Sequence, residues 1–148
     1  VHQLKNFRLK SGVIKSIKFL NEHKYNVFIV TNQAGIARGY YTEKEFISFS
    51  KQLKKKFFTK GCFINDLQYS PYLKGGKVKK YNKNSSLKKP GNKMIKNLTI
   101  KWPIKLNRSF MIGDQIKDEL CASKSNLYFE YVSQNFFNQI KNIIKNSQ

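Results

Sequence analysis

The sequence predicts an α/β fold in which a parallel sheet is flanked by helices. Two short apolar runs, at residues 27–30 and 110–112, show no alternation of polar and apolar residues, which is typical of strands covered on both faces. Segments with helical spacing of apolar residues separate the strand-like runs, and this alternation favours parallel strands. The length of 148 residues is that of a single domain.

Two helices are predicted in the first half of the chain. Ser11 can cap the first helix, whose apolar residues share one face. Those residues are Val13, Ile14, Ile17 and Leu20. Thr42 and Glu45 have the spacing of a capping box, which opens the second helix, and Gly61 is expected to end it.

The second half of the chain continues the alternation. Strands are predicted at residues 63–69, 110–112 and 127–132. Pro90 and Gly91 are expected to open a helix, and Ser133 is expected to cap a last one. The inward positions of these two helices are Met94, Ile95 and Leu98, and Phe136, Phe137, Ile140, Ile143 and Ile144.

Polar residues that can bind an anion follow the first apolar run. Thr31 and Asn32 stand at the carboxyl end of this strand, where ligands bind in parallel sheets. A hydroxyl and backbone N–H groups could hold a phosphoryl oxygen, while Arg38 offers two donors to the far side of a substrate. The alternative is a plain strand followed by a glycine-containing loop. The density of anion donors over residues 31–38 favours a site.

The chain has only eight acidic residues, and two of its three aspartates, Asp114 and Asp118, lie in one short motif. The motif follows the strand predicted at residues 110–112. A carboxylate pair there indicates Mg2+, which prefers one or two carboxylates together with substrate phosphate and water. The alternative is that Asp114 caps the next helix and Asp118 lies on its solvated face. That alternative leaves Gly113 and the second carboxylate unexplained.

Lys88 and Lys89 lie between these two motifs, directly before Pro90 and Gly91. A lysine held by the proline turn would present a fixed positive charge to a transferring phosphoryl group. Because the chain has 29 lysines and arginines, the pair alone is a weak signal. Its place in the order of the motifs is what gives it weight.

The order of the three motifs resembles motifs two, three and four of the haloacid dehalogenase (HAD) superfamily of phosphatases. Residues 31–43, 88–95 and 111–114 are similar to segments of the D-glycero-D-manno-heptose-1,7-bisphosphate 7-phosphatase and histidinol-phosphatase family. The resemblance extends from Val1 to about Val132. It implies hydrolysis of a sugar bisphosphate through an aspartyl-phosphate intermediate, with Mg2+ bridging the nucleophile and the substrate phosphate.

The resemblance also assigns roles by position. It implies that Thr31 and Lys89 stabilise the transferring phosphoryl group and that Asp114 ligates Mg2+, with Asp118 as the second carboxylate predicted above. The resemblance also places several residues at the substrate, which are Asn32, Gln33, Ala34, Lys88 and Gln115. Arg38, predicted above to bind the far side of a substrate, joins this set. Lys88 stands where the family has an arginine, and a lysine lacks the planar fork of that side chain.

Two features of the family are absent from these residues. The family opens with a strand ending in Asp-x-Asp-Gly, which supplies the nucleophile and the general acid, and here no aspartate precedes Asp66. We therefore expect one HAD-like domain over residues 1–148 that is N-terminally truncated, lacks its central first strand, and is inactive and unstable by itself. The loop insertion at residues 70–90 has no cysteine or histidine where family members often bind zinc, so it is expected to be zinc-free.

The net charge of +21 raises nucleic acid as an alternative partner. Polynucleotide 3'-phosphatases share a similar Thr-Asn-Gln-x-Gly-Ile loop, but usually lack the second aspartate that Asp118 supplies. Lysines are spread through every segment and arginine, the better base reader, is scarce. A small phosphorylated sugar is thus the expected partner and nucleic acid is not. A histidinol-phosphatase and a catalytically dead binding module remain alternatives.

The cysteines and the hydropathy of the chain bear on where the protein is expected to act in the cell. Cys62 and Cys121 have no partner pattern and are expected to be free, buried thiols. No stretch is apolar enough to span a membrane and no secretory leader opens the chain. The expectation is a cytoplasmic monomer that does not contact membranes.

Overall fold

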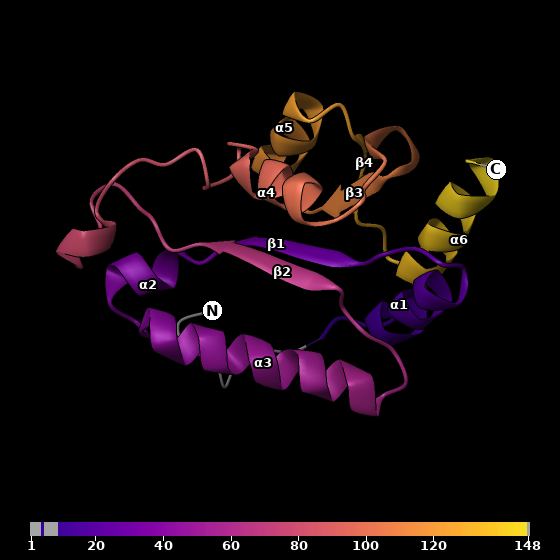
Figure 1. Cartoon of the computed structure of the whole chain (residues 1–148), viewed down its shortest axis with the longest axis horizontal. Coiled ribbons are helices and arrows are strands. Elements are labelled where there is room, and N and C mark those ends of the chain that lie inside the picture. Colours follow the sequence, from indigo (N-terminus) through magenta and orange to yellow (C-terminus); the bar gives the residue numbers. More distant parts are fainter. Residues whose placement is uncertain (1–3, 5–8, 148) are drawn as a thin grey trace.

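Helices and strands alternate along the chain, as predicted (Figure 1). This is a computed structural model, which describes residue 4 and residues 9–147. Val1 and His2, where the family resemblance begins, lie outside the described residues. The helices are α1 (Val13–Glu22), α2 (Ala34–Arg38), α3 (Glu43–Thr59), α4 (Lys93–Lys101), α5 (Ile116–Lys124) and α6 (Phe136–Asn146). The strands are β1 (Phe28–Asn32), β2 (Asp66–Ser70), β3 (Phe110–Gly113) and β4 (Tyr128–Tyr131), and the short 3-10 turns are η2 (Lys79–Tyr81) and η3 (Leu106–Arg108).

The strands form two parallel pairs instead of one continuous sheet. β1 pairs with β2 in a register that sets Phe28 opposite Asp66, and β3 pairs with β4 in a register that sets Phe110 opposite Tyr128. Among the described residues, no strand pairs with the second edge of β1 or of β3. All five residues of β1 are consequently half-buried, so the prediction of a fully buried strand is wrong in this respect.

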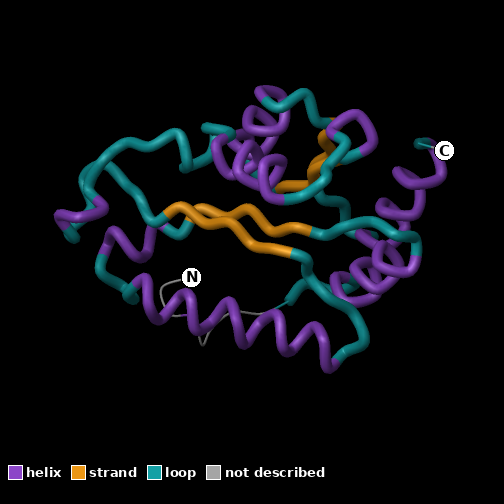
Figure 2. The backbone as a smooth tube through the Cα atoms, in the orientation of Figure 1, coloured by secondary structure: helices purple, strands orange, loops and turns teal. Residues whose placement is uncertain are grey.

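Helices cover the β1–β2 pair on both faces (Figures 1 and 2). α3 lies along one face, where its buried Phe57 packs with Ile29 of β1 and its buried Phe46 packs with Leu67 of β2. α4 lies on the other face. There the indole of Trp102, just after α4, meets the ring of Phe28 edge-on, with 5.7 Å between ring centroids.

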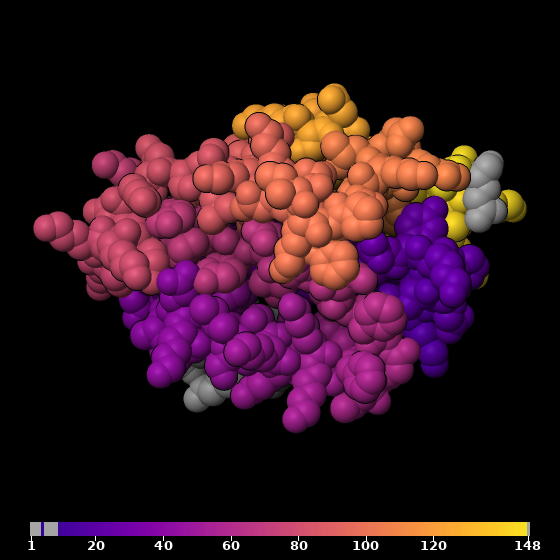
Figure 3. Space-filling view, in the orientation of Figure 1, coloured from indigo at the N-terminus to yellow at the C-terminus, as the bar shows by residue number. Residues whose placement is uncertain are grey.

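α1 and α6 join the two strand pairs. Leu20 of α1 forms a buried cluster with Ile140 and Ile144 of α6. Val27, which precedes β1, packs against this cluster, and so does Phe110 of β3. In Figure 1 these two helices lie at one end of the molecule and α2 lies at the other, and the indigo and yellow atoms in Figure 3 lie together at the end that holds α1 and α6.

The residues at the two ends of α3 agree with the prediction. The capping box of α3 is confirmed, because the Thr42 hydroxyl accepts from the Glu45 N–H and the Glu45 carboxylate accepts from the Thr42 N–H, both at 3.0 Å. Gly61, just past the end of α3, has a φ of 87°, a conformation that favours glycine. The predicted free, buried thiols of Cys62 and Cys121 are also confirmed.

Two other predicted caps are wrong by one or two residues. α1 is preceded by Gly12 with a φ of 85° and not by Ser11. α6 is capped by Asn135, whose Oδ1 accepts from the Asn138 N–H at 3.1 Å, and not by Ser133. Several residues able to cap stand close together at each start, and the tertiary packing selects among them.

None of the described helices is long and apolar enough to cross a membrane.

Candidate active site

The candidate site begins at the carboxyl end of β1. Thr31 and Asn32 are the last two residues of this strand, and Ala34 is the first residue of α2. The Gln33 backbone N–H donates to the Ser70 carbonyl of β2 at 2.8 Å, which extends the parallel pairing by one residue. The Gln33 side chain donates to the Thr31 hydroxyl at 3.0 Å and accepts a hydrogen bond from the Tyr41 phenol. These contacts fix the Thr31 hydroxyl at the end of the strand.

The side chain of Asn32 joins β1 to the loop before α4. Its Nδ2 donates to the Lys89 carbonyl at 3.1 Å, and its Oδ1 accepts from the Lys89 N–H at 2.9 Å. The peptide between Lys89 and Pro90 is cis. Because both backbone groups of Lys89 bind one amide, the residue is held beside the end of β1 although it lies 57 positions along the chain.

The Lys89 ammonium is fixed at the same place. Its Nζ lies 2.6 Å from Asp118 Oδ1 and 3.3 Å from the Val30 carbonyl of β1. The side chains of Lys89 and Asp118 are only 12% and 5% exposed. A buried, well-paired charge of this kind is held in one orientation, which is the condition for preorganised stabilisation of a phosphoryl group.

Asp118 lies in the first turn of α5 and is buried. Its Oδ2 accepts from the backbone N–H groups of Asp114 and Gln115, at 3.1 and 3.0 Å. Burial would raise the pKa of Asp118, but the hydrogen bond and charge of Lys89, with the two N–H donors, bring that pKa below its usual value. The alternative of a solvated Asp118 and a capping Asp114 is wrong, since Asp118 itself accepts these N–H groups.

Gly113 is required by this arrangement. A Cβ at Gly113 would lie 2.6 Å from Asp118 Oδ2 and 2.7 Å from its Cγ, which is closer than real contacts allow. Only a glycine at the end of β3 therefore lets the Asp118 carboxylate reach Lys89. The structure supplies the reason for this glycine, which helix capping left unexplained.

Asp114 is the aspartate that a metal ion could use. Its side chain is exposed and has no hydrogen-bond partner among the described residues, whereas both oxygens of Asp118 are engaged. Within residues 4 and 9–147, no group of three or more histidines, cysteines, aspartates and glutamates could hold a metal ion. One free carboxylate still fits Mg2+, because this ion often binds through one or two carboxylates and completes its shell with phosphate and water.

Three other predicted residues lie outside or at the margin of this network. Arg38 is exposed at the end of α2, and Lys88 is half-buried next to Lys89. Gln115 is exposed before α5, and its backbone N–H donates to Asp118. No hydrogen bond or ion pair joins Arg38 to Lys88 or Gln115 in the part of the chain that the structure describes. The residues that the structure does bring together are Thr31 and Gln33, and separately Asn32, Lys89, Asp118 and the backbone of Asp114 and Gln115.

The sequence interpretation missed a cluster that anchors the neighbouring loop. Glu43, the first residue of α3, accepts from the Tyr69 phenol at 2.6 Å and from the Tyr81 phenol at 2.9 Å. Burial, and then the bond to Glu43, raises the pKa of Tyr69. The same loop meets α2, where the Val78 N–H donates to the Ala37 carbonyl at 2.9 Å. The scarcity of acid in the chain is the signal that could have singled out Glu43.

The chain is similar in sequence to known phosphatases. A D-glycero-beta-D-manno-heptose-1,7-bisphosphate 7-phosphatase from Rhodopseudomonas palustris is 33% identical over 120 residues, which cover 81% of this chain and 67% of the relative. The enzyme of the same name from Yersinia pestis is 30% identical over 127 residues, or 86% of this chain and 68% of the relative. No family model matches the chain.

Two solved structures share the fold. A crystal structure described as a HAD-like phosphatase from Mesorhizobium loti superposes with a TM-score of 0.86 at 18% identity, over 99% of this chain and 78% of that one. The D,D-heptose 1,7-bisphosphate phosphatase of B. bronchiseptica, solved with magnesium and phosphate, gives a TM-score of 0.75 at 17% identity, over 96% of this chain and 75% of that one.

Proposed function

The chain belongs to the D-glycero-D-manno-heptose-1,7-bisphosphate 7-phosphatase family, and we propose on this basis that it contributes most of an active site that removes the 7-phosphate from that bisphosphate. The observation that carries the proposal is the buried Lys89 ammonium, fixed between the end of β1 and Asp118. In this role Lys89 and the Thr31 hydroxyl stabilise the negative charge that develops on the transferring phosphoryl group.

Substrate binding is assigned to the groups around this pair. Asn32 at the end of β1, Gln33 after it and Ala34 at the start of α2 line the substrate loop. Arg38, Lys88 and Gln115 reach the rest of the sugar phosphate. The net charge of +21 supports the proposal, since a positive surface speeds the approach of a bisphosphate.

Asp114 would ligate Mg2+, and Asp118 would support Asp114 as the second carboxylate of the motif. When bound, the ion neutralises charge on the phosphate oxygens. Asp118 acts in this proposal through Lys89 and through the N–H groups of Asp114 and Gln115, which it holds in place.

None of the three aspartates present is suited to be the nucleophile. Asp66 is buried and accepts from Trp102 Nε1 at 2.8 Å and from Lys101 at 2.9 Å, and Asp118 is bound to Lys89. Asp114 is reserved for the metal. We therefore propose that an Asp-x-Asp segment outside these 148 residues supplies the nucleophile and acid, on a strand next to β1 and β3. Residues 1–148 alone are then inactive.

Phosphate release separates the candidate activities. The natural protein, with any residues that precede Val1, and the 148-residue chain are each incubated with Mg2+ and one substrate. The substrates are the heptose bisphosphate, histidinol phosphate and a 3'-phosphorylated oligonucleotide. We expect activity only in the natural protein, and fastest on the bisphosphate. Faster turnover of another substrate would overturn the assignment of the heptose bisphosphate. If the natural protein hydrolysed none of the three substrates, the proposed phosphatase activity would be wrong and the catalytically dead binding module would be favoured.

A pair of lysine variants tests the role of Lys89. Lys89→Gln in the natural protein should lower kcat by about 100-fold or more, as removal of a preorganised donor does. Lys93→Gln removes an equal charge from the exposed start of α4 and should change kcat by less than about twofold. Because Lys89→Gln also disturbs a buried pair, Thr31→Val and Thr31→Ser provide a second test. Loss of activity in the first, with activity kept in the second, is expected.

A further inference from the structure

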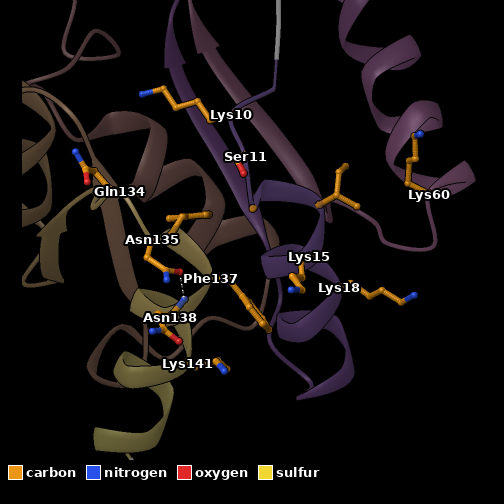
Figure 4. Close-up of a pocket in the computed structure, with 13 residues that line it drawn as sticks. Lys10, Ser11, Lys15, Lys18, Lys60, Gln134, Asn135, Phe137, Asn138 and Lys141 are labelled. Carbon is orange, nitrogen blue, oxygen red and sulfur yellow. Dashed lines mark hydrogen bonds between the residues drawn. The ribbon is translucent and has the colours of Figure 1, made fainter.

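A hollow of about 950 Å³ lies between the start of α1 and the start of α6 (Figure 4). Its volume is within the range of small-molecule sites, which is about 300–1,000 Å³. None of the residues assigned above to phosphate transfer lines it. α1 and α6 lie at the end of the molecule away from α2, so this hollow is separate from the candidate active site (Figure 1).

The hollow is strongly positive. Five lysines line it, from α1, from the segment just before α1, from α6 and from the end of α3: Lys10, Lys15, Lys18, Lys60 and Lys141. No aspartate or glutamate lines it. The two ion pairs found among the described residues are elsewhere, at Lys89 and Lys101. Five like charges around one hollow repel one another, and a multivalent anion between them would relieve that repulsion.

Two of these charges contact the same aromatic ring. The ammonium groups of Lys15 and Lys141 each lie 4.8 Å from the centroid of the Phe137 ring. Figure 4 shows the ring between the two helices with Lys15 and Lys141 beside it, and with Lys10, Lys18 and Lys60 farther out. The ring face attracts cations and thereby partly offsets the repulsion between these two. Two ammonium groups from different helices therefore lie beside the same ring at the hollow.

Uncharged donors also line the hollow, beside the apolar side chains of Ile14, Phe136 and Phe137. Ser11 offers a hydroxyl beside Gly12, which gives α1 no side-chain cap. Asn135 caps α6 through its Oδ1, as the dashed line in Figure 4 shows, so its amide NH₂ remains available as a donor. Neither helix has an acidic residue in its first turn. The positive ends of the two helices therefore add to the field of the lysines.

We propose that this hollow binds a chain of three or more linked phosphates, either as free polyphosphate or as part of a nucleoside triphosphate. A single phosphate could engage only part of the lysine cluster, whereas linked phosphates can reach both the pair at Phe137 and the outer three. The lining contains no arginine, the residue best suited to read bases, and its lysines are gathered around one hollow. These features favour a compact polyanion over a nucleic-acid strand.

Calorimetric titration of the natural protein tests the ligand class. Tripolyphosphate, ATP, AMP, orthophosphate and a single-stranded oligonucleotide are compared at one ionic strength. We expect tripolyphosphate and ATP to bind at least about tenfold more tightly than AMP and orthophosphate. Equal affinity for the first two assigns recognition to the phosphates alone, and tighter binding of ATP assigns part of it to the nucleoside. Absence of tripolyphosphate binding, or tighter binding of the oligonucleotide, would overturn the proposal.

Charge-matched variants test the location. The double variant Lys15→Gln/Lys141→Gln should weaken tripolyphosphate binding about tenfold or more, and Lys15→Arg/Lys141→Arg should keep it. Lys51→Gln/Lys55→Gln removes two charges from the exposed face of α3 and should change affinity less than about twofold. Equal losses in the two glutamine variants would show that only the overall charge matters. A loss in Lys89→Gln would move binding to the candidate active site, and either result overturns the proposal.

Discussion

At the scale of single residues, Lys89 and Asp118 explain how separate motifs form one site. Lys89 comes from the loop before α4 and Asp118 from α5, yet their charged atoms are 2.6 Å apart in a nearly solvent-free place. Removing one member of a buried pair leaves the other unpaired and costs about 3–5 kcal/mol. The site is therefore expected to be sensitive to any change that separates these two side chains.

Substitution of Gly113 tests this sensitivity without touching either charge. In Gly113→Ala, the new Cβ would overlap the Asp118 side chain and force it away from Lys89. We expect the free energy of unfolding to fall by about 1–3 kcal/mol, measured by urea denaturation. A variant as stable as the original protein would show that the carboxylate has room to move and that the glycine is not required.

The Asp118 pair should also shape the dependence of stability on pH. The pKa of Asp118 is lower in the folded protein than in the unfolded chain, so the unfolded chain binds more protons between the two values. The free energy of unfolding should therefore decrease as the pH falls below about 4. In Asp118→Asn this decrease should be smaller, as measured by urea denaturation at a series of acidic pH values.

The control for this experiment is Asp114→Asn, which removes an exposed carboxylate four residues away. The Lys89–Asp118 pair is intact in this variant, so its stability should decrease more steeply toward acidic pH than that of Asp118→Asn. Asp66, whose pKa burial would raise but which the bonds from Trp102, Lys101 and Leu67 lower, contributes a decrease of the same sign that persists in both variants. Identical pH profiles for Asp118→Asn and the unsubstituted protein would contradict the assignment.

At the scale of elements, the start of α3 organises the loop that follows β2. Thr42 and Glu45 cap the helix, while Glu43 between them binds a tyrosine of β2 and a tyrosine of η2. η2 in turn packs near α2, and Gly76 is buried against Ala37 there. The Glu43 carboxylate thus links α3, β2 and η2. These contacts are made by phenol and carboxylate groups and do not include Asp114, the proposed ligand of Mg2+.

Glu43→Ala should release this loop. We expect faster tryptic cleavage at the exposed lysines of the loop, which are Lys74, Lys77, Lys79, Lys80 and Lys83, and a loss of about 1–2 kcal/mol in the free energy of unfolding. Glu43→Gln, which can still accept from a phenol, should have a smaller effect. Tyr128→Phe removes a phenol–carboxylate bond on β4 and should leave cleavage of the loop unchanged. Equal cleavage in Glu43→Ala and the original protein would refute the anchoring role.

At the scale of the whole molecule, two strand pairs are joined by side chains instead of by a shared sheet. The Lys89 network joins them at the candidate site, and the cluster of Leu20, Ile140 and Ile144 joins them through α1 and α6. The surface carries a net charge of +21, with few carboxylates to compensate it. Repulsion across such a surface opposes the compact state.

Salt should therefore stabilise the protein. An increase of ionic strength from about 0.01 to 0.1 M shortens the screening length from about 30 to 10 Å, which weakens repulsion between exposed lysines more than it weakens the buried Lys89 pair. We expect Tm to rise on the order of 2–4 °C, measured by differential scanning calorimetry in sodium chloride. A fall in Tm would mean that attractive ion pairs dominate at the surface.

Local sequence patterns were enough to predict the alternation of helices and strands, the capping box at Thr42 and the polar ends of β1 and β3. Each of these depends on local chemistry, such as hydrophobic period, capping spacing and a glycine at a turn. The folded chain was needed to show that the strands form two pairs, that Asn135 and Gly12 precede their helices, and that Asp118 is buried. These depend on contacts between distant residues. The order of the motifs singled out Lys89 among 29 basic residues, but its buried pairing with Asp118 joins residues 29 positions apart and follows from where the chain places them in space.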